Sequence, residues 1–533
     1  MKTRSKITQG IVLSLLPVII ISLVFYGSYE NYIEKYPVLY KAEKSEVFDI
    51  NVNGSDVFVE HYKDIHYTNF GMKGETEIKI TLPNKVKSYS ISPVRYKIES
   101  ECEGNEIKLK LKVPKKLVVY VNELERLFIF ANQILNETPD TVDNKVVSIN
   151  NYLVDVQGKQ IETLKIQNAI NETAVERKIL YFPAGVYLTG TLELKTNSQI
   201  YLAPGAVILG STDRKDYPQD EGFQEADQVN DPENYTNKGW KMTYSRLILI
   251  GEAENVKIWG RGIIDGQGAI VRQQGKPANL IRVRDSKNVV VEGIMLRDPA
   301  AWNTHILASD NVAFRDIKMI NDRKVYNTDG IDPDGATNVT VDNCFMYCSD
   351  DNIAIKTSGN SNLLQDSHNI VVKNCVFLTK KSAMKLGTET RRNISNVTFE
   401  NNEIVESDRG MSLYSRDGAT FENIFYINNH FEKLFEDNRQ RLLDFDVNFR
   451  SISDAKSYVK KAGQIKNVII KNCTAAGFWP KESTMSGLNN EHKISGVQFI
   501  NFKINGKSRI SLNDAHIKIN NFVDDVTFGV NTK

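Results

Sequence analysis

The 533-residue chain lacks an excess of charge of either sign, with 67 Lys and Arg against 66 Asp and Glu. Proteins that bind nucleic acid through phosphate contacts carry a basic surplus, so the charge balance gives no support for a nucleic-acid partner. Long stretches of helical periodicity are also missing. The 32 glycines and the frequent alternation of Val and Ile with polar residues favour a β-rich protein.

Cysteine is scarce, and the five cysteines have no metal-type spacing. The sequence therefore predicts neither a metal site nor a cofactor. Three of the cysteines lie in repeated strand segments, which favours buried free thiols, although one disulfide remains an alternative. The five positions are Cys102, Cys344, Cys348, Cys375 and Cys473.

The N-terminus carries an apolar segment behind a basic flank. Lys2, Arg4 and Lys6 precede residues 7–29, which contain no charged side chain. Such a length is sufficient to cross a bilayer, and no A-x-A cleavage signature follows it. We expect residues 1–30 to be an uncleaved membrane anchor, with a cleaved export signal as the alternative. The basic flank places the rest of the chain outside the cytoplasm.

Two further regions follow the anchor. Residues 31–135 contain short alternating segments such as EIKITL and RLFIFAN, which predict a small accessory β-sandwich of antiparallel strands. A polar linker near residues 136–145 leads to the segment 160–176, in which Ile166, Ala169 and Ile170 have the spacing of one helical face. We expect this helix to cover the open end of the domain that follows.

From Ile179 onward the sequence repeats itself. The unit is Asn-Val or Asn-Ile inside a strand, then a polar residue and a second strand, as in SKNVVVEG and IKNVIIKN. The intervals are too irregular for propeller blades, and the units are too β-rich for helical repeats. They predict an all-β protein whose residues 145–528 form a right-handed parallel β-helix with coils stacked about 4.8 Å apart. The repeated positions are Asn255, Asn288, Asn311, Asn338, Asn369, Asn396, Asn423, Asn467 and Gly496.

Stacked coils allow side chains to be aligned along one face. Four successive coils contain NTDGID, SDDNIAI, KKSAMKL and DRGMSL, and their apolar anchors are Ile331, Ile353, Met384 and Met411. This alignment predicts one file of Asp329, Asp351, Ser382 and Arg409. The preceding file is Thr328, Asp350, Lys381 and Asp408, and a third is Asp332, Ala354, Lys385 and Ser412. Carboxylates and amines therefore converge on one patch of an elongated face.

The crowding of Asp329, Asp350 and Asp351 points to acid–base chemistry. Single aspartates in β-helix turns usually bond local backbone. Three carboxylates at adjacent coil positions instead raise one another's pKa, which keeps one of them protonated. Glycoside hydrolysis needs this arrangement: one carboxylic acid protonates the leaving oxygen and another carboxylate activates water, with the pair about 6.5–9.5 Å apart in inverting enzymes.

The motifs around these aspartates also resemble a known family. The chain is similar over roughly residues 150–510 to the polygalacturonases, glycoside hydrolase family 28. This resemblance implies that Asp350 is the general acid and that Asp329 and Asp351 activate the water. The small N-terminal sandwich also resembles the dextranase and isopullulanase family, glycoside hydrolase family 49. The motifs that carry the likeness are NTDGID, SDDNIAIKTSG, LGTET, FPAGVYLTGTLELK, IYLAPGAVILGS and GRGIIDGQG.

The chain departs from the polygalacturonase pattern in two places. Residues 381–383 (KSA) replace a Gly-His-Gly, and residues 412–414 (SLY) replace the Arg-Ile-Lys that grips a galacturonate carboxylate. The substrate is therefore a polysaccharide that need not be galacturonan. The candidate substrate-binding residues are Lys385, Lys356, Arg409, Arg416, Trp302 and His305. Lys385 has an alternative structural role, paired with Glu389 or Asp332. Asp444 and Asp446 are expected in a loop, with a local structural role.

Three functions remain open at this level. The first is an inverting glycosidase that acts as a monomer on an α-linked polysaccharide. The second is a β-helix polysaccharide lyase, in which the acidic cluster would hold Ca²⁺ and Lys385 or Lys356 would abstract a proton. The third is a non-catalytic glycan-binding surface protein.

Overall fold

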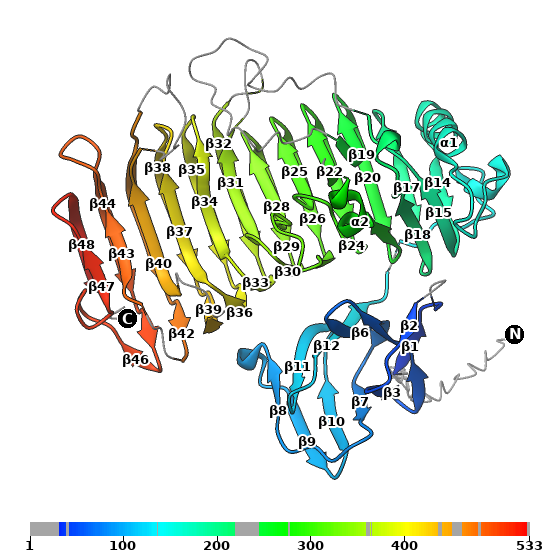
Figure 1. Cartoon of the computed structure of the whole chain (residues 1–533), viewed down its shortest axis with the longest axis horizontal. Helices are drawn as coiled ribbons and strands as arrows, with labels where there is room; N and C mark the ends of the chain where they lie inside the picture. Colours follow the sequence, from blue (N-terminus) through cyan, green and yellow to red (C-terminus); the bar gives the residue numbers. More distant parts are fainter. Residues whose placement is uncertain are drawn as a thin grey trace, which may run out of the picture.

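The computed structural model describes residues 31–38, 42–135, 137–218, 245–274, 278–358, 363, 365–434, 440–449, 461–477 and 481–529, and Figure 1 shows two all-β units. The predicted membrane anchor, residues 1–30, lies outside the described residues. Among the helices of the described part, none is both long and apolar enough to cross a bilayer.

The N-terminal unit is the predicted β-sandwich. One sheet has the order β2-β5-β6-β12-β11-β8 with β1 beside β6, and the other has the order β4-β3-β7-β10-β9. Most pairs are antiparallel, but β6 and β12 run parallel. The strands are β1 (Tyr32–Lys35), β2 (Glu43–Lys44), β3 (Asp49–Val52), β4 (Ser55–Val57), β5 (Val59–Tyr62), β6 (Ile65–Lys73), β7 (Thr76–Thr81), β8 (Tyr89–Ser92), β9 (Glu99–Glu103), β10 (Glu106–Leu111), β11 (Lys115–Val121) and β12 (Arg126–Gln133), with a 3-10 turn at Val94–Tyr96.

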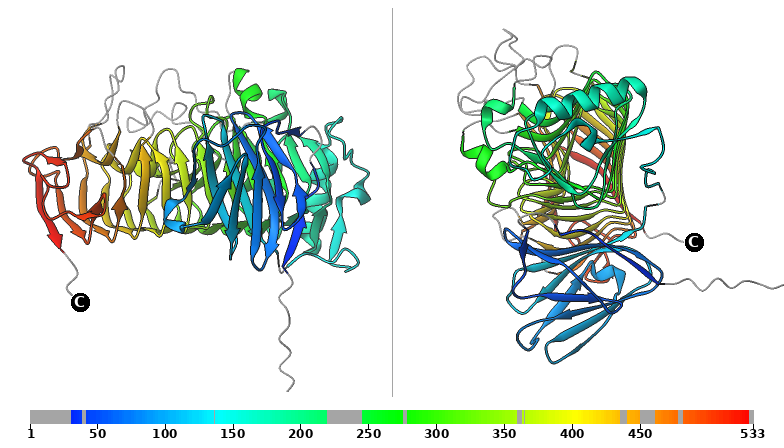
Figure 2. Two further views of the ribbon diagram at one scale, coloured as in Figure 1. Left: turned by 90° about the horizontal axis from the view of Figure 1, so that it is seen from below. Right: turned by 90° about the vertical axis from the view of Figure 1, so that its right-hand side faces the viewer.

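The second unit is a right-handed parallel β-helix built from three long sheets, and each coil adds one strand to each sheet. Figure 2 shows the stack from the side and along its axis. The 13-stranded sheet contains β13 (Val146–Ser148), β14 (Ile179–Phe182), β17 (Gln199–Leu202), β20 (Glu254–Gly260), β23 (Lys287–Glu292), β26 (Asp310–Arg315), β29 (Thr337–Asp342), β32 (Ser367–Lys373), β35 (Ile394–Glu400), β38 (Thr420–Ile427), β41 (Gln464–Lys471), β44 (Ile494–Ile500) and β48 (Val523–Gly529).

The 12-stranded sheet contains β15 (Gly185–Thr189), β18 (Ala206–Gly210), β21 (Ile263–Asp265), β24 (Met295–Arg297), β27 (Lys318–Ile320), β30 (Phe345–Cys348), β33 (Val376–Thr379), β36 (Glu403–Ser407), β39 (His430–Leu434), β42 (Thr474–Ala475), β45 (Lys503–Ile504) and β46 (Lys507–Ser508). The 11-stranded sheet contains β16 (Leu192–Leu194), β19 (Ser245–Gly251), β22 (Ala278–Arg284), β25 (Thr304–Leu307), β28 (Ile331–Asp334), β31 (Ile353–Thr357), β34 (Ser382–Thr390), β37 (Arg409–Ser415), β40 (Arg441–Val447), β43 (Ser483–Ser486) and β47 (Ile517–Ile519).

Helix α1 (Thr163–Glu176) packs on the first strands of the stack, as the sequence predicts. Its buried face contains Ile166, Ala169 and Ile170, which cover apolar atoms that the first coil would otherwise expose. A short helix, α2 (Gly268–Gln273), and 3-10 turns at Ile149–Tyr152 and Arg214–Asp216 complete the elements.

The repeated asparagines occupy one conformation in every coil. All eight have a left-handed backbone with φ between 51° and 59°, and Gly496 has φ 69° at the ninth position. Asparagine tolerates this region better than most residues, which explains why it recurs there. Their side-chain amides form an exposed ladder, for example from Asn311 to Asn288 at 2.7 Å and from Asn423 to Asn396 at 3.0 Å.

The five cysteines are free thiols, so the alternative of a disulfide is not realised. Four of them are buried inside the β-helix, and Cys102 is exposed on the sandwich. Their neighbours in the stack are apolar side chains, where a thiol packs as a small hydrophobic group.

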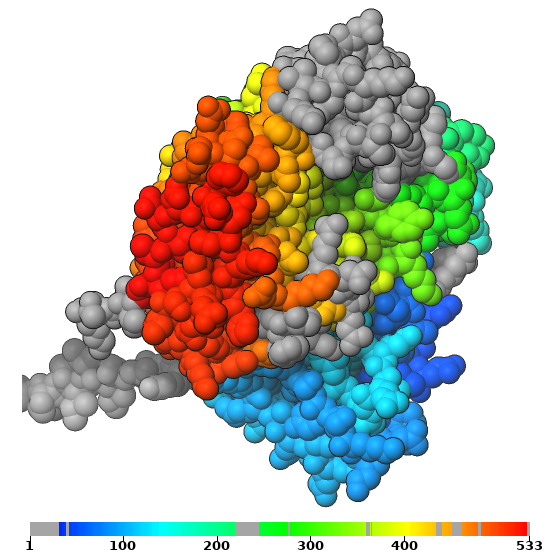
Figure 3. All heavy atoms as spheres, turned by 60° about the vertical axis from the view of Figure 1, so that its left-hand side comes forward, coloured from blue at the N-terminus to red at the C-terminus, as the bar shows by residue number. Residues whose placement is uncertain are grey.

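The sandwich packs against the 12-stranded sheet (Figures 2 and 3). Phe128 and Phe130 on β12 contact the ring of Phe345 on β30, with centroid distances of 4.9 and 5.0 Å. Ion pairs surround this apolar contact. Arg126 donates to Glu406 at 2.7 Å, and Lys116 lies 2.7 Å from Asp316. The sandwich thus covers one flank of the β-helix and leaves the 11-stranded sheet to carry the candidate site.

Candidate active site

The strand register places the predicted aspartates together. Ile331 pairs with Ile353, Ile353 with Met384 and Met384 with Met411, which confirms the anchors of the alignment. Asp329 precedes β28. Asp350 and Asp351 lie in the bend between β30 and β31. One carboxylate oxygen from each of the three aspartates lies within 4.8 Å of the other two.

Asp351 is held as a carboxylate by two cations and a backbone amide. Lys385 Nζ lies 2.5 Å from its Oδ2, and the Ser382 amide donates to its Oδ1 at 2.9 Å. Burial alone would raise the pKa of Asp351, but Lys385 and Arg409 hold that pKa below its ordinary value. The sequence predicts Glu389 or Asp332 as the structural partner of Lys385. In the structure the partner is Asp351, because the long lysine side chain extends to the preceding coil.

Asp350 and Asp329 have the opposite electrostatics. Burial raises the pKa of Asp350, and the neighbouring Asp351 raises it further. Burial also raises the pKa of Asp329 well above its ordinary value, together with the charges of Asp332 and Asp350. Asp329 Oδ1 is buried and has no hydrogen-bond partner within the described part of the chain. The cluster therefore combines one carboxylate that stays ionised with two carboxyls that favour the protonated form.

Two further aspartates on β28 belong to this environment. Burial raises the pKa of Asp332 to about 8, although Lys356 lies 3.7 Å away and opposes the shift. Asp334 accepts hydrogen bonds from His305 Nε2 at 3.0 Å and from the Ser358 amide at 2.6 Å. Sequence reasoning did not select Asp334. The available signal was the coil alignment, because Asp334 pairs in register with Lys356.

Three candidate binding residues pack near one another: Lys356 on β31, His305 on β25 and Trp302 just before β25. The Lys356 ammonium lies 3.5 Å from the centre of the Trp302 ring, and both side chains are buried. His305 is also buried, and burial lowers its pKa to about 4, so the imidazole is neutral. His305 pairs in register with Asp332 and forms a hydrogen bond with Asp334. Contact of Trp302 and His305 with substrate stays a prediction.

The remaining candidates, Arg409 and Arg416, lie two coils beyond Asp351, at the start of β37 and just after its end. Arg409 Nε donates to Ser382 Oγ at 2.9 Å, and the guanidinium is buried beside Asp351. Arg416 forms an ion pair with Asp446. Both arginines therefore extend the positive side of the cluster along the 11-stranded sheet.

Asp444 and Asp446 lie on β40, not in a loop as the sequence suggested. Their segment LLDFDV alternates apolar and polar residues, and strand periodicity turns both aspartates to the same side as the candidate site. Asp444 accepts a hydrogen bond from the Tyr414 hydroxyl at 2.5 Å, and Asp446 binds Arg416. The expected local structural role agrees with these contacts.

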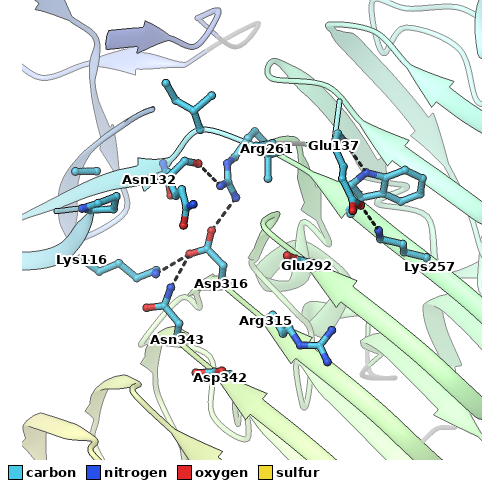
Figure 4. A pocket seen from close by; sticks show the side chains of 16 residues that line it. Lys116, Asn132, Glu137, Lys257, Arg261, Glu292, Arg315, Asp316, Asp342 and Asn343 are labelled. Atoms are coloured by element: carbon cyan, nitrogen blue, oxygen red, sulfur yellow. Dashed lines mark hydrogen bonds and ion pairs between the residues drawn. The ribbon is translucent and has the colours of Figure 1, made fainter. Parts of the chain in front are cut away.

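A cavity lies between the two units, away from the aspartates. Figure 4 shows this cavity of about 600 Å³, in which Lys116 and Arg261 both bind Asp316. The cations and anions that line it largely pair with one another. The 11-stranded sheet, with its aspartate cluster, remains the candidate site.

Two groups of side chains in the described residues have the donor atoms of a cation site: the aspartate cluster and the set His61, His66 and Glu125 on the sandwich. At the aspartate cluster, Lys385 forms an ion pair with Asp351 and Lys356 forms one with Asp332, so lysine side chains supply positive charge there.

Comparison with known proteins identifies the class. A family model described as "Glycosyl hydrolases family 28" matches residues 222–524, more than half of the chain, and the chain belongs to this family. This membership confirms the predicted family, the parallel β-helix and the class of enzyme, a glycosidase.

Individual relatives agree with the family. A probable polygalacturonase of Vitis vinifera is 26% identical over 273 residues, covering 48% of this chain and 54% of that protein, so the match spans about half of the relative's length. An exo-poly-alpha-D-galacturonosidase of Dickeya chrysanthemi is 25% identical over 431 residues, covering 71% and 70%. The structure of an exopolygalacturonase from Thermotoga maritima shares the fold with a TM-score of 0.55 at 20% identity, covering 74% of this chain and 93% of that one.

Proposed function

We propose that the chain is an inverting glycosidase that cleaves α-linked galacturonan or a related acidic polysaccharide. The supporting observation is the opposite perturbation of two adjacent carboxyls. Burial and a like charge raise the pKa of Asp350, whereas Lys385 and Arg409 lower that of Asp351 against the effect of burial. Adjacent carboxyls with divergent pKa values supply an acid and a base at one pH.

In this mechanism Asp350 is the general acid. Its raised pKa keeps the proton available, and the proton passes to the glycosidic oxygen as the bond to the sugar breaks. Asp351 accepts a proton from the attacking water. The positive charge of Lys385 keeps Asp351 ionised before the reaction, so the base does not compete with Asp350 for its proton.

Asp329 completes the water site. Its carboxyl lies beside both partners, and its unpaired Oδ1 offers a hydrogen-bonding position for the water. The raised pKa of Asp329 favours a shared proton, so the negative charge of the base pair rests mainly on Asp351. Closest oxygens within 4.8 Å are nearer than the separation of about 6.5–9.5 Å between carboxyl groups in inverting enzymes, so the stereochemical outcome is the sharpest test of this assignment.

Acidic sugar residues are the proposed substrate because cations line the face around the aspartates. Lys356, Lys385 and Arg409 lie on three successive strands of the 11-stranded sheet, and Arg416 directly follows the last of them. The relatives from Vitis vinifera and Dickeya chrysanthemi carry polygalacturonase and galacturonosidase in their names, which supports galacturonan as the first substrate to examine. A neutral α-glucan is the second candidate, since the family's Arg-Ile-Lys is replaced at residues 412–414.

The test is digestion of galacturonan, rhamnogalacturonan, dextran and pullulan, with NMR of the anomer first released. Inversion at the cleaved carbon supports the assignment, and retention would overturn it. Asp350→Asn and Asp351→Asn should each lower kcat by about 10²–10⁴-fold, the usual contribution of one general acid or base. Asp342→Asn is the matched control, because Asp342 lies on the 13-stranded sheet beside Lys373. Wild-type rates in Asp350→Asn would exclude the proposed acid.

The same digests separate the two competing functions. A lyase releases an unsaturated product that absorbs in the ultraviolet, and chelation of Ca²⁺ would abolish it. A non-catalytic surface protein binds glycan without any cleavage.

We also propose that the enzyme is exported as a monomer and held at the membrane by residues 1–30. The uncharged segment 7–29 behind a basic flank supports this location. Recovery of the full-length chain in the soluble extracellular fraction would exclude the anchor, and light scattering of the purified protein measures its oligomeric state.

A further inference from the structure

Two histidines and a glutamate converge at one edge of the sandwich, outside the glycosidase site. His61 on β5 and His66 on β6 are direct cross-strand partners, and their rings stack with centroids 4.5 Å apart. Glu125 lies in the turn just before β12, the parallel neighbour of β6. Three chain segments thus deliver one donor side chain each to the same point.

The donor atoms have the spacing of a tetrahedral metal site. The Nε2 atoms of His61 and His66 lie 3.1 and 3.5 Å from the same oxygen, Glu125 Oε2. Bond lengths of about 2.0–2.2 Å to zinc at tetrahedral angles separate donor atoms by roughly 3.3–3.5 Å. One donor atom from each of the three side chains lies within 4.8 Å of the other two, so the side chains are close enough to share one cation.

The exposure of the donors also suits a metal. His66 is buried, whereas His61 and Glu125 are partly exposed, so a cation and a fourth ligand from solvent have access.

We propose that His61, His66 and Glu125 bind a divalent transition-metal cation of the zinc class, with solvent in the fourth position. Two imidazoles and one carboxylate form a donor set that zinc accepts. No step of the glycosidase mechanism involves this site, and its proof or failure is independent of the sugar chemistry.

Its role follows from what the three ligands adjoin. Lys63, two residues after His61, lies 3.3 Å from Asp298 and 3.6 Å from Asp322 of the β-helix. Arg126, the residue after Glu125, donates to Glu406 and to the Tyr347 hydroxyl. A cation that joins the β5–β6 hairpin to the turn before β12 therefore fixes the two sandwich segments that hold the β-helix. Asp322 lies in the segment between β27 and β28 that contains Asp329, so a cation bound at the three ligands supports this segment from outside.

The experiment uses the tag-free full chain after chelation and dialysis. Zn²⁺ is added, and binding is measured by calorimetry and by metal analysis after gel filtration. Co²⁺ replaces Zn²⁺ in parallel, because its visible absorption distinguishes tetrahedral from octahedral ligands. The variants are Glu125→Gln and His61→Asn, and His368→Asn on the 13-stranded sheet is the matched control.

We expect one equivalent of Zn²⁺ on the parent and on the His368→Asn control, a higher Tm with the cation, and an affinity lower by at least about tenfold in the two ligand variants. Glu125 is half exposed, so Glu125→Gln should fold and retain galacturonan cleavage. If the chelated parent, after Zn²⁺ is added back, retains no Zn²⁺ through gel filtration, the proposal is overturned. Equal binding by the parent and both ligand variants would also overturn it, because the metal would then lie elsewhere.

Discussion

Lys385→Met separates two roles for this lysine: tuning of Asp351 and binding of substrate. The parent places Lys385 Nζ 2.5 Å from Asp351 Oδ2, and Asp351 is only 2% exposed. At an effective dielectric constant of about 20, two unit charges at this distance attract by roughly 6–7 kcal/mol. The cost of burying the charges offsets part of this attraction, and removing one member of a buried pair typically costs about 3–5 kcal/mol.

In Lys385→Met, protonation of Asp351 removes the buried unpaired charge and so reduces this loss of stability. A protonated Asp351 cannot act as the base, so the acid limb of the kcat/KM profile should move to higher pH. Just above the acid limb of the parent, kcat should fall by about 10²–10⁴-fold and recover as the pH rises. Lys385→Arg retains the positive charge and is the matched control.

The measurement is a pH series of initial rates on the polymer that the parent cleaves, with KM and kcat fitted separately. A residue that only grips substrate would raise KM by a similar factor at every pH and leave the limb in place. An unmoved acid limb in Lys385→Met would therefore refute the tuning of Asp351, whatever the size of the loss in rate.

Two further predictions concern stability. Asn402→Ala should lower the free energy of unfolding by about 1–3 kcal/mol in urea titrations, since it removes the acceptor of the Cys375 amide and the donor to Val372 inside the stack; an unchanged midpoint would show that the stack does not depend on this amide. Burial raises the pKa of Glu403 to about 7 despite Arg95. The folded state therefore holds a proton that the unfolded state releases, and stability that is present below pH about 4.5 is lost as the pH rises through 7. Glu403→Gln should flatten this dependence, by up to about 3 kcal/mol, in unfolding curves collected across that pH range. A parent whose stability rises with pH over this interval would contradict the shift.

The fold could be predicted because the stack is periodic. Eight coils repeat the same asparagine at a left-handed position, and the alternation of apolar residues fixes which side chains enter the core. Register along a file then follows from the sequence alone, which is why Ile331, Ile353, Met384 and Met411 align as expected. The three aspartates followed from the same alignment.

The partners of the charged side chains could not be predicted in the same way. Lys385 pairs in register with Ala354, yet its long side chain reaches diagonally to Asp351, which is a matter of rotamer and not of file. The misplacement of Asp444 and Asp446 had another cause. The long interval between Asn423 and Asn467 suggested a loop, whereas the strand period of LLDFDV within that interval continued the sheet.

The packing of the sandwich on the β-helix could not be predicted from the sequence either, because the contacts join segments more than two hundred residues apart. Phe128 meets Phe345, and Arg126 meets Glu406, without any shared motif. These contacts bury outward-facing side chains of the 12-stranded sheet. One strand of this sheet, β30, leads directly into the bend that contains Asp350 and Asp351.

This arrangement bears on what replaces the family's missing histidine and Arg-Ile-Lys. In a β-helix, neighbouring coils lie about 4.8 Å apart, so long side chains from two coils can reach the same place. A charge lost at one position can therefore be supplied by a residue of the neighbouring coil. Here the positive charge beside Asp351 comes from Lys385 and Arg409, both on the same face, and not from residues 381–383 or 412–414. A cation bonded to the base is less available to a substrate carboxylate. We therefore expect recognition of an acidic sugar to depend more on Lys356 and Arg416. Their partners Asp332 and Asp446 both have raised pKa values and lose their negative charge by taking up a proton. Glu389, also 3.7 Å from Lys356, is then an acidic neighbour of this lysine that competes with the substrate carboxylate.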